Sequence, residues 1–119
     1  MTGSAADLML RNPKTLAGDA SVAEVRDQLA NPKVQMVLLA DGQVFRGAIT
    51  ELPADAVPTD AALDYADAEP ETITPDGSAD DAFERASASP HRRVIVLDDD
   101  DRLLGLLCLN VARTGFCRS

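Results

Sequence analysis

An internal repeat constrains the fold of this chain more than any other feature. Residues 12–21, NPKTLAGDAS, align with residues 69–78, EPETITPDGS, at a constant offset that pairs Pro13 with Pro70 and Thr15 with Thr72. The match continues to Gly47 and Gly105 after one extra residue in the second copy. A unit of this length leaves one face of its small sheet uncovered, so two copies are expected to cover one another.

Each copy carries the same predicted order of elements: strand, helix, strand, strand. A short β-prone pair, Thr15-Leu16 or Thr72-Ile73, precedes a helix whose first residues form a capping-box pattern, from Ser21 or Ser78. Apolar residues at helical spacing give each helix one core-facing side. The expected strands are a buried one at residues 36–40 or 94–97 and another that ends at residue 49 or 107, across a turn.

The fold class predicted from this order is a mixed α+β protein. It consists of tandem repeats over residues 1–58 and 59–119, which together form one compact module with a pseudo-twofold pair of small sheets covered by helices. A short helix is expected from Thr50, and another over residues 59–66, starting at Thr59 or Asp60 and packing Leu63 and Tyr65.

Composition and charge exclude several classes of function. The 119 residues carry 20 acidic and 11 basic side chains and a formal net charge of -9, which opposes attraction to nucleic-acid phosphates and to anionic membranes. No apolar run approaches the roughly 18 residues that span a bilayer, and no signal segment is evident. A cytoplasmic protein is expected, with neither nucleic acid nor membrane among its partners.

The two copies resemble the paired CBS domain, also called a Bateman module. The resemblance rests on ADLMLRNPKTLAGDASVAEVRDQL and MVLLADGQVFRGAIT in the first copy, and on ETITPDGSADDAF and RRVIVLDDDDRLLGLL in the second. It implies a stand-alone, non-catalytic regulatory or sensor module that binds an adenosine-type ligand in a cleft between the repeats. The implied ligands are AMP, ADP, ATP or S-adenosylmethionine, and the implied partners are a second copy, in a homodimer, and an unknown regulated protein.

The ligand motif of that family is incomplete in both copies. In the family, Gly, two apolar residues, Ser or Thr, two variable residues and Asp mark the site, where the hydroxyl faces phosphate or ribose and the Asp binds the ribose hydroxyls. The first copy matches from Gly47 to Thr50 but has Pro53 at the Asp position, whereas the second has Cys108 for the hydroxyl and Val111 for the Asp. An alternative function is therefore a module that has lost nucleotide binding and acts in dimerisation or protein interaction.

The candidate ligand-binding residues lie at strand ends or beside the cleft that the resemblance implies. Thr50 either faces the ligand or serves as the N-cap of a following helix. The arginines after His91 can hold a phosphate through bidentate contacts, but local charge balance against Asp98–Asp101 is the preferred interpretation. The candidates are Leu16, Ile49, Thr50, Thr72, Ile73, Arg92 and Arg93.

No pattern of catalytic or metal-binding residues is found. His91 is the single histidine, which excludes a His-based triad or a multi-histidine metal site within one chain. The run Asp98–Asp101 lacks the spacing of a calcium loop and is predicted to be a solvated turn. Cys108 is predicted to be a small buried hydrophobe and Cys117 a reduced thiol on a tail, with redox control through a Cys117 disulfide across a dimer as a third function.

Overall fold

The computed structural model describes residues 2–117, and the chain separates into two compact units. One unit is Lys14–Glu69, and the other joins the residues up to Pro13 with those from Pro70 onward. These units do not follow the predicted boundary between residues 58 and 59. The first residues of the chain join the unit that contains Pro70 onward because they pair with its sheet. Residues 59–69 stay with the unit that begins at Lys14 because they pack on its last strand.

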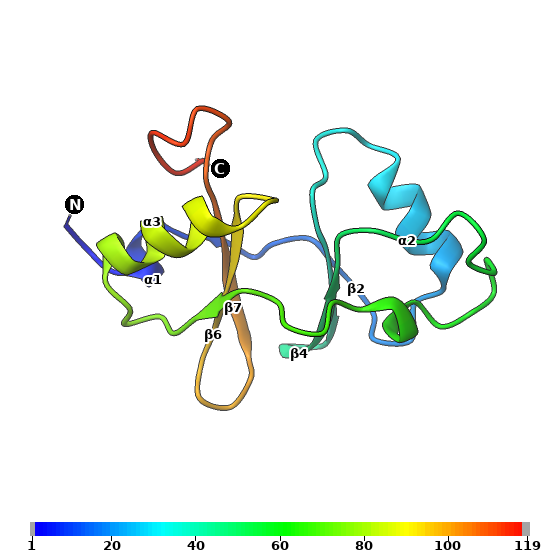
Figure 1. Ribbon diagram of the computed structural model, residues 1–119. Helices are drawn as coiled ribbons and strands as arrows, with labels where there is room; N and C mark the ends of the chain where they lie inside the picture. The colour runs from blue at the N-terminus through cyan, green and yellow to red at the C-terminus, as the bar shows by residue number, and fades with distance from the viewer. Residues whose placement is uncertain (1, 118–119) are drawn as a thin grey trace. The chain divides into compact units, whose positions relative to one another are not determined.

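The unit Lys14–Glu69 contains a three-stranded mixed sheet and one α-helix (Figure 1). The strand order is β2-β3-β4, with β2 parallel to β3 and β3 antiparallel to β4. A two-residue turn with Gly42 in the left-handed region joins β3 to β4, as the Asp-Gly pair predicts. The elements are β2 (Thr15–Leu16), α2 (Val22–Leu29), β3 (Val37–Asp41), β4 (Val44–Ile49) and the 3-10 helix η1 (Ala62–Tyr65).

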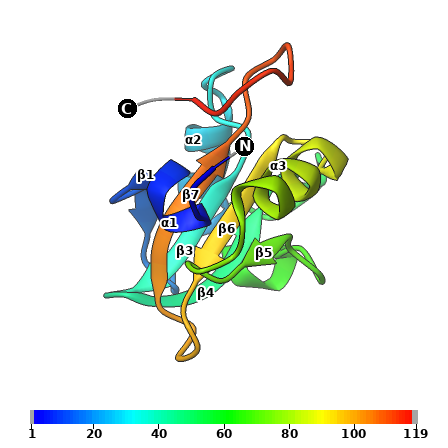
Figure 2. The ribbon, with the colours of Figure 1, turned by 90° about the vertical axis from the view of Figure 1, so that its left-hand side faces the viewer.

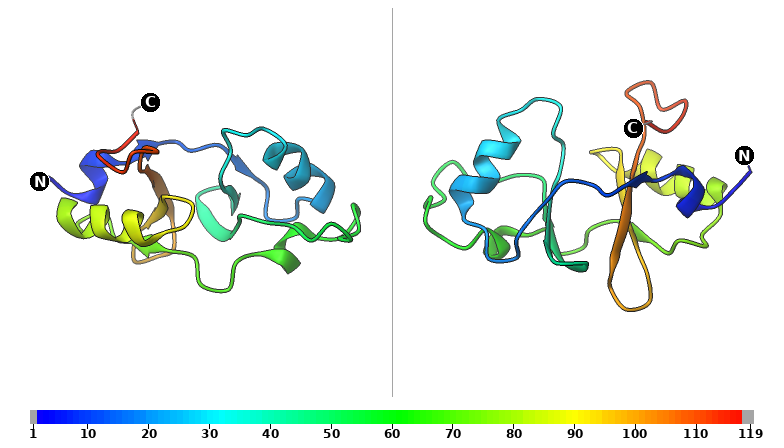
Figure 3. Two further views of the ribbon diagram at one scale, coloured as in Figure 1. Left: turned by 45° about the horizontal axis from the view of Figure 1, so that its top comes forward. Right: turned by 180° about the vertical axis from the view of Figure 1, so that it is seen from behind.

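The other unit contains a four-stranded mixed sheet with strand order β1-β7-β6-β5. Its two helices, α1 and α3, lie together over one face of that sheet (Figure 2). The turn between β6 and β7 projects from the end of the unit opposite the C-terminal segment (Figure 3). The elements are α1 (Ala5–Leu8), β1 (Leu10–Arg11), β5 (Thr72–Ile73), α3 (Ala79–Ala88), β6 (Arg93–Leu97) and β7 (Leu103–Cys108).

The strand registers confirm the internal repeat and the mixed α+β fold class. Thr15 pairs with Leu38 in one unit, and Thr72 pairs with Ile95 in the other, so the parallel strands keep the offset that the sequence shows. The antiparallel pairs are interrupted by register shifts at corresponding places, between residues 39 and 40 and between residues 96 and 97. Each copy therefore folds in the predicted order of strand, helix, strand, strand.

The helix starts confirm the hydroxyl half of each predicted capping box. Ser21 Oγ accepts a hydrogen bond from the Glu24 amide at 3.3 Å, and Ser78 Oγ accepts one from the Asp81 amide at 3.1 Å. The Asp81 carboxylate accepts a bond at 3.0 Å from Nε of Arg85, four residues later on the same helix. The hydroxyl therefore caps each helix, and in α3 the acid at the third position stabilises the exposed side through its ion pair with Arg85.

Each unit has a hydrophobic core of its own. In one, Val22 and Val25 of α2 have no exposed surface, and Leu39 of β3 and Ile49 of β4 are equally buried. In the other, small residues of α3 pack on a sheet of larger aliphatic ones. This core contains Ala5, Ile73, Ala82, Ala86, Val94, Val96, Leu107 and Leu109, with Phe83 and Phe116 packed against it.

The two additional helices predicted between residues 50 and 66 are corrected by the structure. No helix begins at Thr50; the following residues are irregular, because Pro53 disfavours helical backbone at Leu52 and Pro58 lacks the amide hydrogen that a helix interior would need. In place of a helix over residues 59–66, the 3-10 helix Ala62–Tyr65 forms after Ala61. Leu63 packs on the core as expected, whereas the Tyr65 hydroxyl donates to the Asp60 carboxylate at 3.2 Å.

The repeated glycine marks a close approach in each unit. A Cβ atom at Gly47 would lie 2.9 Å from Cδ1 of Leu63, and one at Gly105 would lie 2.8 Å from the carbonyl oxygen of Leu10 and closer still to Met9. The glycines therefore let η1 pack on β4 and let the N-terminal segment pack on β7. No helix within residues 2–117 has the length and apolar character to cross a membrane.

Candidate ligand-binding site

Thr50, directly after β4, lies beside a carboxylate that the motif does not contain. Its hydroxyl donates to Asp67, with both carboxylate oxygens 3.3 Å away. The Asp67 amide donates to the carbonyl oxygen of Ala48 in β4 at 2.8 Å, which fixes the segment after η1 against the strand. Thr50 therefore caps no helix, and its half-buried hydroxyl is paired with a half-buried acid 17 residues further on.

Asp67, and not the residue at the predicted Asp position, provides the carboxylate beside Thr50. Pro53, at that position, belongs to a loop fastened to α2, where Nη2 of Arg26 donates to the carbonyl oxygens of Pro53 at 3.1 Å and Ala56 at 3.3 Å. Asp67 is not among the predicted residues because it lies outside the motif spacing. The only available signal was Gly47, which allows the segment that carries Asp67 to approach the strand.

Three of the predicted apolar candidates belong to the cores. Ile49 has no exposed surface and pairs with Val37 across the sheet. Leu16 is half-buried and packs against the same core, and Ile73 is 7% exposed in the core of the other unit. These residues shape the strand ends rather than offer polar groups to a ligand.

Thr72 lies at a hollow of about 300 Å³ within the unit that contains β5. Arg85 crosses this region, donating from Nη1 to the Thr72 carbonyl oxygen at 3.0 Å and to the Glu71 carboxylate at 3.2 Å. The Asp81 carboxylate raises the pKa of Arg85. The hollow is lined by Thr72, Ile73, Thr74, Gly77, Asp81, Arg85, Leu97, Asp98 and Asp101.

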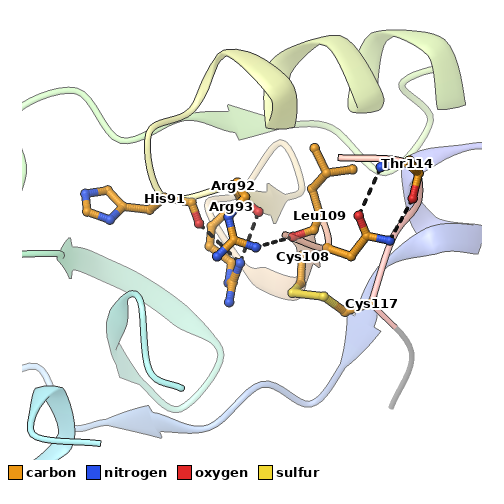
Figure 4. The surroundings of a disulfide bond; sticks show 8 residues. His91, Arg92, Arg93, Cys108, Leu109, Thr114 and Cys117 are labelled. Atoms are coloured by element: carbon orange, nitrogen blue, oxygen red, sulfur yellow. Dashed lines mark hydrogen bonds between the residues drawn. A yellow bond between two sulfur atoms is a disulfide. The ribbon is translucent and has the colours of Figure 1, made fainter. Parts of the chain in front are cut away.

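Arg92 and Arg93 form a cationic pair next to the start of β6 (Figure 4). Nη1 of Arg92 donates to the carbonyl oxygen of Leu109 at 3.0 Å, and Arg92 itself has a left-handed backbone with φ of 57°. Nη1 of Arg93 donates to the carbonyl oxygens of His91 at 3.2 Å and of Arg92 at 3.3 Å. Burial, and then the neighbouring Arg92 charge, lower the pKa of Arg93.

The charge-balance interpretation of these arginines is wrong. Within residues 2–117, neither guanidinium lies within ion-pair distance of a carboxylate. The Asp98 carboxylate instead accepts the amides of Asp100 at 2.8 Å and Arg102 at 2.9 Å, so it organises the turn between β6 and β7. Among the residues that the structure describes, these two adjacent, half-buried cations therefore lack a counterion, which is an electrostatic environment that favours an anion.

The two cysteines form a disulfide within the chain, Cys108–Cys117, with Cα atoms 5.2 Å apart (Figure 4). The prediction of a buried Cys108 is confirmed, since it is 7% exposed, but the predictions of a reduced Cys117 and of a disulfide across a dimer are wrong. Residues after β7 turn back so that Leu109 and Phe116 form a bridge, and this turn brings the sulfur atoms together. The sequence separation of nine residues carried no specific signal for that pairing.

The second copy consequently has neither polar group of the family motif at the motif positions. The Cys108 sulfur is bonded to Cys117, and Val111, at the Asp position, is 82% exposed. Within residues 2–117 no group of three or more His, Cys, Asp or Glu side chains is placed to hold a metal ion. The polar groups suited to ligand binding are the Thr50–Asp67 pair and the arginine pair.

One family model matches part of the sequence, and solved structures of other proteins have a similar fold. Residues 62–110 match the family model of the CBS domain. The CBS-pair protein CBSX2 from Arabidopsis thaliana has a TM-score of 0.75 at 17% identity, covering 91% of this chain and 89% of that one. The CBS domains of a transcriptional regulator from Streptococcus pneumoniae have a TM-score of 0.72 at 17% identity, covering 87% and 91%.

A structure of CBSX2 in complex with AMP is also similar, with a TM-score of 0.72 at 18% identity and coverage of 88% and 89%. No curated protein matches the sequence. These structures share the fold of this chain, with its two repeats. Of the two copies, the second matches the CBS-domain family model, and the whole chain has the fold of CBS-pair structures.

Proposed function

We propose that this protein is a non-catalytic sensor that binds an adenosine nucleotide. The observation that carries the proposal is the Thr50–Asp67 pair, in which a hydroxyl and a carboxylate lie 3.3 Å apart at the end of β4. The family motif supplies the same two groups for phosphate or ribose. Asp67 thus offers the carboxylate that Pro53 cannot, although it arrives from a different part of the chain.

The carboxylate has spare capacity for ribose hydroxyls. An ionised carboxylate can accept about four hydrogen bonds, and Asp67 receives one from the Thr50 hydroxyl. Ribose hydroxyls donating to the remaining positions would form charge-assisted bonds, which contribute about 1.5 to 3 kcal/mol each. We therefore assign Asp67 to the ribose and Thr50 to the orientation of that carboxylate.

In the other unit, the arginine pair by itself favours an anion that carries phosphate, a group that S-adenosylmethionine lacks. Arg92 and Arg93 have no carboxylate partner within residues 2–117, and a phosphate would supply the missing negative charge. AMP, ADP and ATP carry that group and S-adenosylmethionine does not. The relative CBSX2, which has been observed with AMP, supports an adenylate as the first ligand to test.

A thermal-shift series tests this function. We expect AMP, ADP or ATP at about 100 times its dissociation constant to add roughly 2.7 kcal/mol of stability, which corresponds to a rise of several degrees in the midpoint. GMP, which carries the same ribose and phosphate on another base, is the matched ligand control, and Thr50→Val is the matched variant. A flat response to every adenylate would remove the sensor function.

A second function is favoured by the damaged second copy. Cys108 is committed to a disulfide and Val111 lies in solvent, so half of the module lacks the motif groups. The alternative is a dimerisation or protein-interaction unit without a nucleotide. A flat ligand panel together with a stable dimer in sedimentation equilibrium would favour this alternative over the sensor.

We also propose that the sensor acts inside the cell as a homodimer and passes its ligand state to a protein partner. A switch of this kind needs a ligand that binds two arrangements of the module with different affinity. Sedimentation equilibrium with and without AMP measures this directly, because a ligand that favours one assembly state must shift the dissociation constant of the dimer.

A further inference from the structure

The nine residues after β7, residues 109–117, fold back on the end of that strand; we call them the return segment. The Asn110 amide donates to the carbonyl oxygen of Gly115 at 2.9 Å, and the Cys117 amide donates to the carbonyl oxygen of Cys108. The disulfide Cys108–Cys117 closes the base of this loop. The covalent bond and the backbone bonds therefore hold the same turn.

The return segment begins at the residue that fixes Arg92. The Leu109 amide donates to the Arg92 carbonyl oxygen at 2.9 Å, while Nη1 of Arg92 donates to the Leu109 carbonyl oxygen at 3.0 Å (Figure 4). Arg93 pairs with Cys108 across the antiparallel strands, so their side chains leave the same face of the sheet. Cys108 thus lies opposite Arg93 and directly precedes Leu109, the hydrogen-bond partner of Arg92.

We propose that the Cys108–Cys117 disulfide controls anion binding by Arg92 and Arg93, with the oxidised chain binding a phosphate-type anion more tightly than the reduced chain. The inference rests on the proposed function only where it identifies the anion as the phosphate of an adenylate. Binding of an inorganic anion by the arginine pair stands apart from it.

The oxidised state orders the arginines without using up their donors. A guanidinium has five N–H donors, and the side-chain bonds of both arginines run from Nη1 to backbone carbonyl oxygens. Nε and Nη2 of each arginine remain for an anion among the contacts within residues 2–117. Because an ordered side chain loses less freedom when it binds, fixing Arg92 through Leu109 raises the affinity.

Reduction loosens this arrangement but leaves the return segment attached. The rings of Phe116 and Phe83 meet edge to face with centroids 6.1 Å apart, and Nη1 of Arg113 donates to the carbonyl oxygen of Ser87. Phe116 also packs against the core of its unit. These contacts persist without the disulfide, so the reduced protein stays folded, while Cys108, which pairs with Arg93, is no longer joined to Cys117.

The chemistry of the switch is a two-electron exchange with a dithiol reductant. Cys117 is more exposed than Cys108, so a thiolate of the reductant attacks Sγ of Cys117, the sulfur–sulfur bond breaks, and Cys108 leaves as a thiolate. The positive charge of Arg93, on the same face, stabilises that thiolate before it takes a proton. The second thiolate of the reductant then attacks the mixed disulfide, releasing the Cys117 thiolate, which also takes a proton, and the reductant ends as a disulfide.

The test is a calorimetric titration of the whole protein with inorganic pyrophosphate and, separately, with AMP, before and after treatment with dithiothreitol. We expect reduction to weaken pyrophosphate binding by about three- to tenfold, the effect of freeing one or two side chains. A thiol count must rise from none to two with the treatment. Cys117→Ser should bind like the reduced protein and should not respond to dithiothreitol.

Charge-matched variants assign the effect to the pair. Arg93→Gln should weaken pyrophosphate binding, whereas Arg102→Gln, which removes the same charge from the exposed turn between β6 and β7, should leave it nearly unchanged. Equal pyrophosphate affinity in the two redox states, or none in either, overturns the inference even if AMP binds. A redox-dependent pyrophosphate affinity without AMP binding supports the inference and counts against the adenylate sensor.

Discussion

Single residues decide what the repeated motif can still do. Thr50 keeps its hydroxyl and acquires Asp67 as a neighbour, so one copy retains both polar groups despite Pro53. The other copy replaces its hydroxyl with Cys108, whose sulfur is bonded to Cys117. The two copies share a backbone pattern, but a residue outside the repeated motif, Asp67 in one copy and Cys117 in the other, contacts the position of the motif hydroxyl.

Tyr65 gives a pH prediction that can be assigned to one group, because it is the single tyrosine in a chain without tryptophan. Partial burial and the hydrogen bond to Asp60 raise the pKa of Tyr65 above its ordinary value of 10.0. Its contribution to stability is therefore fully present below pH 10.0 and is lost as the pH rises through the pKa of the folded state.

The check is a titration of tyrosinate absorbance in folded and unfolded protein, combined with denaturation at increasing pH. Tyr65→Phe should lack this part of the pH dependence. Asp60→Asn should move the pKa of Tyr65 back toward its ordinary value, because it removes the negative charge beside the phenol. An apparent pKa that is equal in the folded and unfolded states would refute the prediction.

At the scale of elements, a segment outside the repeated order of strand, helix, strand, strand packs on or pairs with the sheet of each unit. In one unit η1 packs on β4, and in the other β1 pairs with β7. Gly47 and Gly105 make room for these segments, which explains why the glycine occurs in both copies even though the polar part of the motif does not.

We expect Gly105→Ala to lower the free energy of unfolding by about 1 to 3 kcal/mol, the usual range for overpacking in a core. The added methyl group would meet the carbonyl oxygen of Leu10 at 2.8 Å, and backbone cannot move as a side chain can. Gly115→Ala is the control, since no atom lies within 4 Å of its built Cβ. Chemical denaturation of both variants measures the difference, and equal stabilities would show that β1 does not pack closely on β7.

For the whole molecule, the sequence was sufficient to predict the fold class but only part of the candidate site. The offset of the repeat, Ser21 and Ser78 as helix starts and the Asp41-Gly42 turn all express local physics, and the structure confirms them. Asp67 and the disulfide depend on segments that return to a strand end, and no local pattern specifies such returns.

The same limit explains the incorrect prediction for the arginines. Arg92 and Arg93 lie close in sequence to Asp98–Asp101, which suggested charge balance, but the left-handed backbone at Arg92 turns this segment toward Leu109. The Asp98 carboxylate meanwhile accepts hydrogen bonds from backbone amides in the turn between β6 and β7. Sequence proximity gave the wrong partner because backbone geometry decides which groups meet.

The most direct measurement of adenylate recognition is a calorimetric titration with AMP of the natural protein, Asp67→Asn and Asp64→Asn. Both variants remove one carboxylate from neighbouring positions, but only Asp67 lies beside Thr50. We expect Asp67→Asn to weaken AMP binding by roughly 10- to 100-fold, the loss of one or two charged hydrogen bonds, and Asp64→Asn to change it little. Equal AMP affinities for both variants and the natural protein would mean that Asp67 does not bind the ribose.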